Sequence, residues 1–384
     1  MSFQTPALSR RQLLKHASLI TAAAGVACPA WSQPGKAAAS RSSIVVAQAV
    51  DFSQAQQDVS KDFLIGSRAA WQDINLRGGV RGRQVQHQAL ETDGTPASLR
   101  TALDSVKDNP SCVVLSGSVG DQVASQIVAL SVQGGLNLAH AAPWLQNSSL
   151  EIDDKTFPIF AARQEQITYA LKSLQSMGLK ELGAIYATAQ DHTAYHADVE
   201  RIATTMQLKL QPFKAEGNLR ALGQKLTPKT PAVLLFVGGT PELAEFTQGM
   251  EKQARQRYIV ALADVNLQTM LQMGAGRNTP VIATQPVPLV NAALPVVRSY
   301  RETLARLFDE PPTPLSLAGF IAARYTYEVL SEVEGPLNRA SVLSAFQRRT
   351  NLNVGGFAVS FNLQRRSGTY VTQSMMTVDG RLIG

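Results

Sequence analysis

Between residues 44 and 140, short apolar runs alternate with segments that carry an apolar residue at every third or fourth position. Short runs are typical of strands, and the periodic segments are typical of helices with one buried face. Thr95 and Pro96 fit a helix start, because Thr caps a first turn and Pro has no N–H to lose there. Strands are predicted at 44–49, 85–90, 112–116 and 136–140, and helices at 63–76, from 95 and at 121–133.

The same alternation begins again at residue 156. The run 232–237 is apolar at every position, which predicts a central strand. Two segments of the tail, 357–361 and 370–378, alternate like the arms of a hairpin. The other predicted strands are 156–161, 182–186, 208–212, 259–263 and 281–284, and the predicted helices are 164–177, 192–206, 241–255, 292–308, 315–333 and 340–348.

Repeated strand–helix–strand units predict parallel sheets with helices on both faces. Two such series therefore predict an α/β fold with two doubly wound lobes. In these sheets a ligand lies beyond the carboxyl ends of the strands. The loops at those ends are 48–58, 116–122, 140–147, 187–192, 238–242 and 264–266.

Composition narrows the possible functions. The chain has 384 residues, 45% of them hydrophobic, so it can bury a full core. Its net charge is +7, but the basic residues are scattered and none form a block of five, so no nucleic-acid partner is expected.

Motifs for cofactor or hydrolase chemistry are not found. The segment after the third strand, 116–120, has two glycines at the wrong spacing for dinucleotide binding, and no phosphate loop is present. Ser116 also stands where a serine hydrolase needs its first glycine. We therefore expect no cofactor and no enzymatic activity.

The N-terminus carries an arginine pair, Arg10 and Arg11, before a weakly apolar run of about 14 residues. This arrangement resembles a twin-arginine export signal, with cleavage expected near Ser32. The run is too short to cross ~30 Å of hydrocarbon, so the mature chain is not expected to insert stably into a membrane. Cys28 would leave with the signal, and Cys112 is then expected to be a buried thiol.

Several residues in or near the strand-end loops allow two interpretations of their role. Asp121 either caps the following helix or contacts a ligand, and Asp264 either pairs with a ligand cation or caps a helix. Trp144 either stacks on a ligand or is buried. Asp191 lies near two histidines, His192 and His196, and these are read as exposed polar residues rather than a metal site. The isolated His87 and His140 are read as hydrogen-bonded strand residues.

One motif points to a known family. The segment Ile74-Asn75-Leu76-Arg77-Gly78-Gly79-Val80-Arg81-Gly82-Arg83 resembles a signature of type I periplasmic solute-binding proteins, the Leu/Ile/Val-binding group that serves ABC importers. The glycines fit a helix stop and a tight turn into the next strand. The loop 91–96 and the unit 231–255 are similar to later parts of that family.

The resemblance implies two Rossmann-like lobes that are joined by three hinge crossovers and close on a small solute. The crossovers are expected near 154–160, 285–288 and 354–357. The implied segments are an export signal at 1–32, a first lobe at 43–156 plus 286–353, and a second lobe at 157–285 plus 354–384.

The resemblance also implies the site. Asp264 matches the acid that takes the ligand ammonium, whereas Asp121 and Trp144 stand where the family has small hydroxyl residues. A carboxylate beside a ligand carboxylate is repulsive, so a solute with a cationic or donor-rich end fits better. The expected ligand-binding residues are Asp121, Gln122, Ala142, Trp144, Asp191, Thr240 and Asp264, with no catalytic or metal-binding residue.

These features predict the periplasmic substrate-binding component of an ABC importer. Its expected partners are a small polar or amino-acid-like solute and the importer's permease subunits. A periplasmic sensor that reports its ligand to a signalling protein is the alternative, because one fold serves both roles.

Overall fold

The computed structural model describes residues 43–384, except 134–135, 148–149, 177, 216, 277, 349 and 361–367. The predicted export signal and Cys28 lie outside the described residues. The described chain begins with β1 (Ile44–Asp51), which is buried at every position and pairs in parallel with β2 (Val85–Thr92) and β3 (Cys112–Ser116). Burial on both faces is typical of a central strand in a doubly wound sheet, which explains why β1 is apolar except at Gln48 and Asp51.

Within the described residues the first sheet has five parallel strands in the order β2-β1-β3-β4-β5. β4 (Ala139–Ala141) and β5 (Thr156–Phe157) complete it. Side chains of α2 (Pro96–Lys107) and α3 (Asp121–Val132) form the core on one face. The other face is covered by α1 (Gln57–Leu76), α9 (Pro295–Leu307), α10 (Pro314–Ser331) and α11 (Arg339–Gln347).

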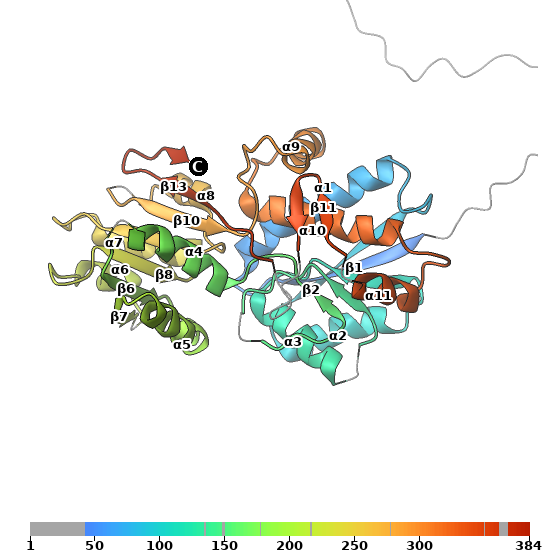
Figure 1. Cartoon of the computed structure of the whole chain (residues 1–384), viewed down its shortest axis with the longest axis horizontal. Helices are drawn as coiled ribbons and strands as arrows, with labels where there is room; N and C mark the ends of the chain where they lie inside the picture. Colours follow the sequence, from blue (N-terminus) through green and yellow to red (C-terminus); the bar gives the residue numbers. More distant parts are fainter. Residues whose placement is uncertain are drawn as a thin grey trace, which may run out of the picture. The chain divides into compact units, whose positions relative to one another are not determined.

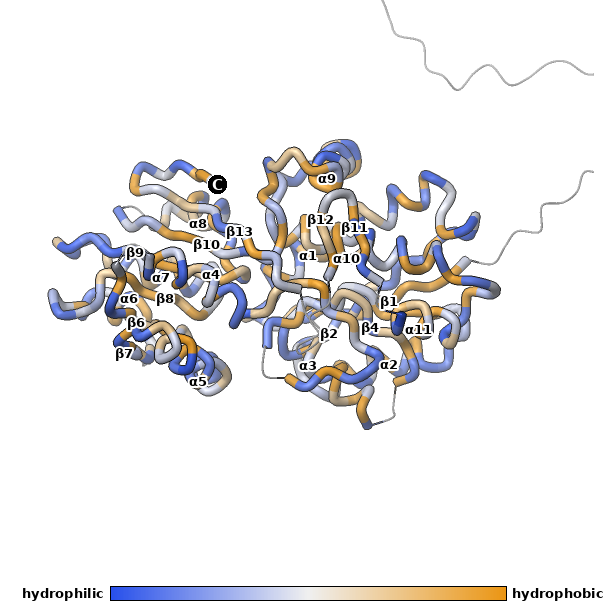
Figure 2. Tube along the Cα trace, in the orientation of Figure 1, coloured by the Kyte–Doolittle hydropathy of each residue, from blue (hydrophilic) through white to orange (hydrophobic). Residues whose placement is uncertain are grey.

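The second sheet has seven strands among the described residues, in the order β14-β13-β10-β9-β8-β6-β7 (Figure 1). Its core strand β8 (Val233–Val237) is buried and hydrophobic at every position, as predicted (Figure 2). The helices of this lobe are α4 (Arg163–Ser176), α5 (Ala189–Thr205), α6 (Leu219–Gln224), α7 (Thr240–Met250) and α8 (Leu267–Gln272). The other parallel strands are β6 (Glu181–Tyr186), β7 (Lys209–Lys214), β9 (Tyr258–Ala261) and β10 (Val281–Gln285).

The tail differs from the predicted hairpin. β12 (Phe357–Val359) pairs with β11 (Leu352–Val354), whereas β13 (Thr372–Met376) runs antiparallel to β10 and to β14 (Leu382–Ile383). The prediction was wrong because alternation marks a half-buried strand without identifying its partner.

The chain passes between the two sheets three times in the described part, after β5, after β10 and after β12. The first two passages lie where they were predicted. The third was expected at 354–357, but those residues form the turn between β11 and β12. Val354, Phe357 and Val359 are buried in the first lobe's core, so the third passage follows Val359.

The glycine motif has the conformation that the sequence predicted. Gly78 and Gly79 have φ angles of 103° and 73° directly after α1 ends, and a Cβ on Gly79 would lie 2.0 Å from the carbonyl oxygen of Arg83. Only glycine fits both requirements at this turn.

Two other glycines allow α1 and α10 to touch. A Cβ on Gly66 would lie 1.7 Å from the carbonyl oxygen of Ser316, and a Cβ on Gly319 would lie 1.9 Å from that of Phe63. The two helix backbones are therefore in direct contact, and the crossing leaves no room for a larger residue.

Two histidine predictions had different outcomes. Nε2 of His87 lies 2.8 Å from Oε1 of Gln48, which confirms a hydrogen-bonded strand residue. His140 is buried, and neither ring nitrogen has a hydrogen-bond partner among the described residues, so that prediction was wrong. Burial lowers the pKa of both imidazoles to about 4. Cys112 is buried, as predicted, and burial raises the pKa of its thiol.

Candidate functional site

The carboxyl ends of the two sheets bring several predicted residues together. Asp264 follows β9 in the second lobe, and Trp144 follows β4 in the first. Nε1 of Trp144 donates a hydrogen bond of 3.2 Å to Oδ1 of Asp264, and both side chains are buried. A side chain of the first lobe therefore contacts a side chain of the second lobe directly.

Arg163 is one of the site residues that sequence reasoning missed. It is the first residue of α4, directly after the first passage between the sheets, and its Nη2 lies 2.6 Å from Oδ2 of Asp264. Its guanidinium carbon also lies 3.9 Å from the centre of the Tyr195 ring. Burial lowers the pKa of Arg163, but Tyr195 and the nearby carboxylates outweigh it, so the pKa is raised above its ordinary value.

Asp121 holds a loop and does not cap its helix. Gly120 is the N-cap of α3, without a side-chain cap, and Asp121 lies in the first turn. Oδ1 of Asp121 accepts hydrogen bonds from the backbone N–H groups of Gln146 and Asn147, at 2.7 and 3.0 Å. Its Oδ2 accepts one of 2.5 Å from the hydroxyl of Tyr195, which belongs to α5 of the second lobe. The N-cap reading was therefore wrong.

Trp144 is buried rather than exposed for stacking. Its ring contacts Phe63 and Phe160 edge-on or tilted, at centroid distances of 5.7 and 5.4 Å. Nearby Ala142 is buried and has a φ of 48°, a left-handed conformation that costs free energy for a residue with a Cβ. The loop after β4 is thus anchored in the first lobe's core by the Trp144 ring.

The remaining predicted residues lie at the starts of helices. The hydroxyl of Thr240, in the first turn of α7, accepts a 2.9 Å hydrogen bond from the backbone N–H of Asn266. Asp191 forms a capping box with Thr188 on α5, and burial raises the pKa of its carboxyl. Gln122 is exposed on α3. Of these three residues, only Asp191 takes part in capping a helix.

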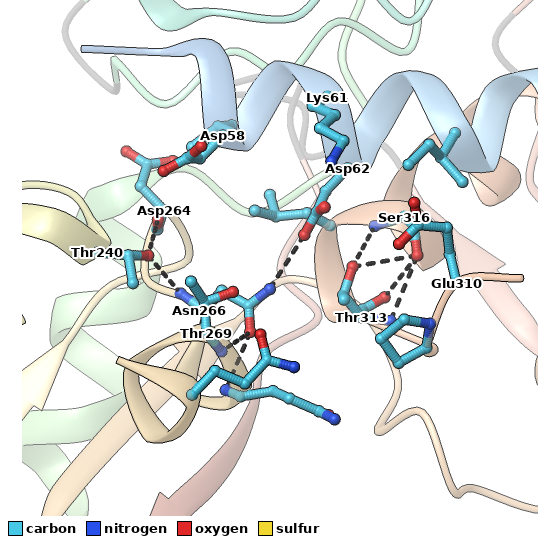
Figure 3. A pocket seen from close by; sticks show the side chains of 16 residues that line it. Asp58, Lys61, Asp62, Thr240, Asp264, Asn266, Thr269, Glu310, Thr313 and Ser316 are labelled. Carbon is cyan, nitrogen blue, oxygen red and sulfur yellow. Dashed lines mark hydrogen bonds between the residues drawn. The ribbon is translucent and has the colours of Figure 1, made fainter. Parts of the chain in front are cut away.

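A cavity of about 270 Å³ begins beside Thr240 and Asp264. Its wall in the first lobe includes Asp58 and Asp62 on α1, and the side chain of Asn266 closes it from the second lobe. Nδ2 of Asn266 donates a 3.0 Å hydrogen bond to Oδ2 of Asp62 (Figure 3). Burial raises the pKa of Asp62, with hydrogen bonds and Lys61 acting against it.

Within the described part of the chain, no group of three His, Cys, Asp or Glu side chains is placed to hold a metal ion. His192 and His196 stack on each other with ring centroids 4.5 Å apart, and Nδ1 of His196 lies 3.1 Å from the Tyr186 hydroxyl.

Among the described helices, none is long and apolar enough to cross a membrane.

Two doubly wound lobes with polar residues meeting at their strand ends define the class of two-lobed binding proteins. Residues 43–379 match the sequence profile of the family described as periplasmic binding protein. The chain belongs to this family, and its fold is that of the type I members. A search of curated proteins found no match.

Solved structures share this fold at low sequence identity. An extracellular ligand-binding receptor from Verminephrobacter eiseniae has a TM-score of 0.81 and 18% identity, covering 89% of this chain and 100% of that one. An ABC transporter substrate-binding protein from Desulfitobacterium hafniense in complex with Leu has a TM-score of 0.70 and 18% identity, over 89% and 99%. A fatty acid ABC transporter substrate-binding protein from Thermomonospora curvata has a TM-score of 0.75 and 13% identity, over 89% and 91%.

Proposed function

We propose that this chain is the extracytoplasmic substrate-binding component of an ABC importer. It captures a small polar or amino-acid-like solute between its lobes, and closure of the hinge buries that solute. The observation that carries the proposal is the direct meeting of polar side chains from both lobes, Trp144 with Asp264 and Tyr195 with Asp121. Family membership and the similarity to ABC substrate-binding proteins support it.

The proposed ligand-binding residues are those nearest this meeting point. Trp144, Thr240 and Asp264 lie at the lobe interface, and Ala142 and Asp191 belong to loops that approach it. Asp121 acts in our proposal by holding the 146–147 loop, and the exposed Gln122 is kept only as a rim residue. Binding needs no bond chemistry, so we propose no catalytic step.

We propose lobe boundaries that follow the sheets. The first lobe comprises 43–157 plus 286–359, and the second comprises 158–285 plus 360–384, so that the first boundary moves by one residue from the expected 156 to keep β5 whole. The change from the boundary expected at 354 follows from the β11–β12 hairpin, which packs on the first lobe's core. We also propose export to the periplasm through the twin-arginine route, with the signal cleaved near Ser32, and docking on the importer's permease subunits.

The test is a ligand screen followed by a measurement of closure. Purified protein is screened by thermal shift against amino acids, amides, polyamines and aromatic acids. A solute at 100 times its Kd is expected to add about 2.7 kcal/mol of stability. Small-angle scattering with and without that solute should then show a smaller radius of gyration.

Two variants localise the binding. Asp264→Ala and Trp144→Ala are expected to weaken binding of the identified solute, and Asp104→Asn, an exposed residue of α2, is the control. Unchanged affinity in both variants would remove this site, and a complete absence of binding or compaction would refute the proposed function.

A further inference from the structure

The acid expected to receive a solute cation is already neutralised. Asp264 uses one carboxylate oxygen for the Arg163 guanidinium at 2.6 Å and the other for the Trp144 indole at 3.2 Å. Both partners are buried side chains of the protein itself. A cationic group of the solute would therefore need other carboxylates.

The cavity beside Asp264 supplies them. It lies between α1 of the first lobe and the start of α8 in the second, with Glu310 in its wall from the segment that precedes α10. The Asp62 carboxylate points toward Asn266 across this space and is joined to it by a hydrogen bond (Figure 3). The cavity is thus bounded by both lobes, as a site that closes on a solute must be.

The lining of the cavity carries excess negative charge. Asp264 is paired with Arg163, which leaves Asp58, Asp62 and Glu310 against one lining lysine, Lys61. This is an excess of two negative charges.

The helix dipole stabilises the negative charge of only one of these three acids. Asp58 lies in the first turn of α1, where a negative charge is stabilised by the helix dipole. Asp62 lies one turn further into α1, and Glu310 lies outside any helix. Asp62 accepts a hydrogen bond from Asn266 and Glu310 is exposed, and a bound cation would add a positive charge beside both.

The volume limits the size of the occupant. The cavity volume of about 270 Å³ lies just below the range for small-molecule pockets, which starts near roughly 300 Å³. A short aliphatic chain with an amine or guanidine fits this space, and the N–H groups of its cation would donate hydrogen bonds to the lining carboxylates.

We propose that the solute of this protein carries an ammonium or guanidinium group, which lies in the cavity between α1 and α8 against Asp62, with Asp58 and Glu310 beside it. This inference rests on the proposed function and names the chemical class of its solute. It moves the cation site away from Asp264, whose carboxylate serves Arg163 and Trp144.

The test compares probes of matched length and different charge. Binding of 1,4-diaminobutane and agmatine to the purified protein is measured by calorimetry, with butane-1,4-diol and succinate as the neutral and anionic counterparts. We expect at least one of the two amines to bind at least tenfold more tightly than the diol, and succinate to show no binding.

Two substitutions remove one charge each without changing side-chain size. Asp62→Asn is expected to weaken amine binding at least tenfold, and Asp104→Asn on the distant α2 is expected to leave it unchanged. Equal affinities for amine and diol, no binding of either amine, or equal effects of the two substitutions would overturn the proposal. Urea unfolding of Asp62→Asn checks that the variant is folded, and Glu310→Gln provides a second removal of charge if it is not.

The outcomes separate this inference from the proposed function. If the amines do not bind but another solute binds and compacts the protein, the cation site is refuted and solute capture stands. If no solute in the wider screen binds, solute capture itself is refuted.

Discussion

Replacing Arg163 by methionine is expected to destabilise the protein strongly. Methionine keeps much of the buried volume but removes the positive charge that neutralises Asp264. Asp264 is only 7% exposed, so water cannot replace the guanidinium without opening the site. The variant would leave a buried carboxylate with one neutral donor, the Trp144 indole.

The expected cost follows from the geometry of the pair. At 2.6 Å and an effective dielectric constant of about 20, the attraction is about 6 kcal/mol. Part of this attraction offsets the desolvation of both groups, and breaking a buried pair typically costs about 3–5 kcal/mol. We expect Arg163→Met to lower the free energy of unfolding by that amount.

The assay is urea unfolding followed by circular dichroism at pH 7. Arg201→Met is the matched control, because Arg201 pairs with Asp198 on the surface of α5 and such exposed pairs contribute about 0–1 kcal/mol. A double variant, Arg163→Met with Asp264→Asn, should recover much of the loss because no unpaired charge remains. A loss for Arg163→Met within about 1 kcal/mol of the Arg201→Met loss would refute this account of the site.

Two further predictions concern the first lobe. His87 and His140 stay neutral in the folded protein until about pH 4, whereas the unfolded chain binds protons below about pH 6.5, so stability should fall between these pH values by up to about 3 kcal/mol per histidine. Urea unfolding at pH 7 and 4.5 measures this fall, and a double His→Gln variant with the same pH dependence would contradict it. Gly319→Ala should cost about 1–3 kcal/mol, because its Cβ meets the Phe63 carbonyl oxygen. Ser331→Ala near the end of the same helix is its control. Equal urea unfolding midpoints for the two variants would contradict the prediction, because they would show that α1 and α10 can move apart without loss of stability.

The sequence predicted the fold through local signals. The apolar run of β8, the Thr95-Pro96 start of α2 and the glycines after α1 each have a conformation that neighbouring residues dictate. Strand pairing in the tail depends on residues distant in the chain, so the alternation around Phe357 could not show that β12 pairs with β11 rather than with β13.

The candidate site was predicted in part. Asp264 and Trp144 follow strands, and the rule that ligands lie at strand ends identified their loops. Arg163 starts a helix after a passage between sheets, and Tyr195 lies within α5, where no such rule applies. An arginine in that place could have been noted as a counter-charge for Asp264, but only the three-dimensional structure shows that the two side chains meet.

The contacts of Gly66 with Ser316 and of Gly319 with Phe63 have a consequence for how specificity could change over time. These contacts fix the distance between α1, which carries Asp62, and α10, which begins after Thr313. The two helices line the cavity in the first lobe, so their backbone contact sets the position of that wall. A different solute would be accommodated by substituting side chains that line the cavity. A larger distance between α1 and α10 would require substitutions at both Gly66 and Gly319.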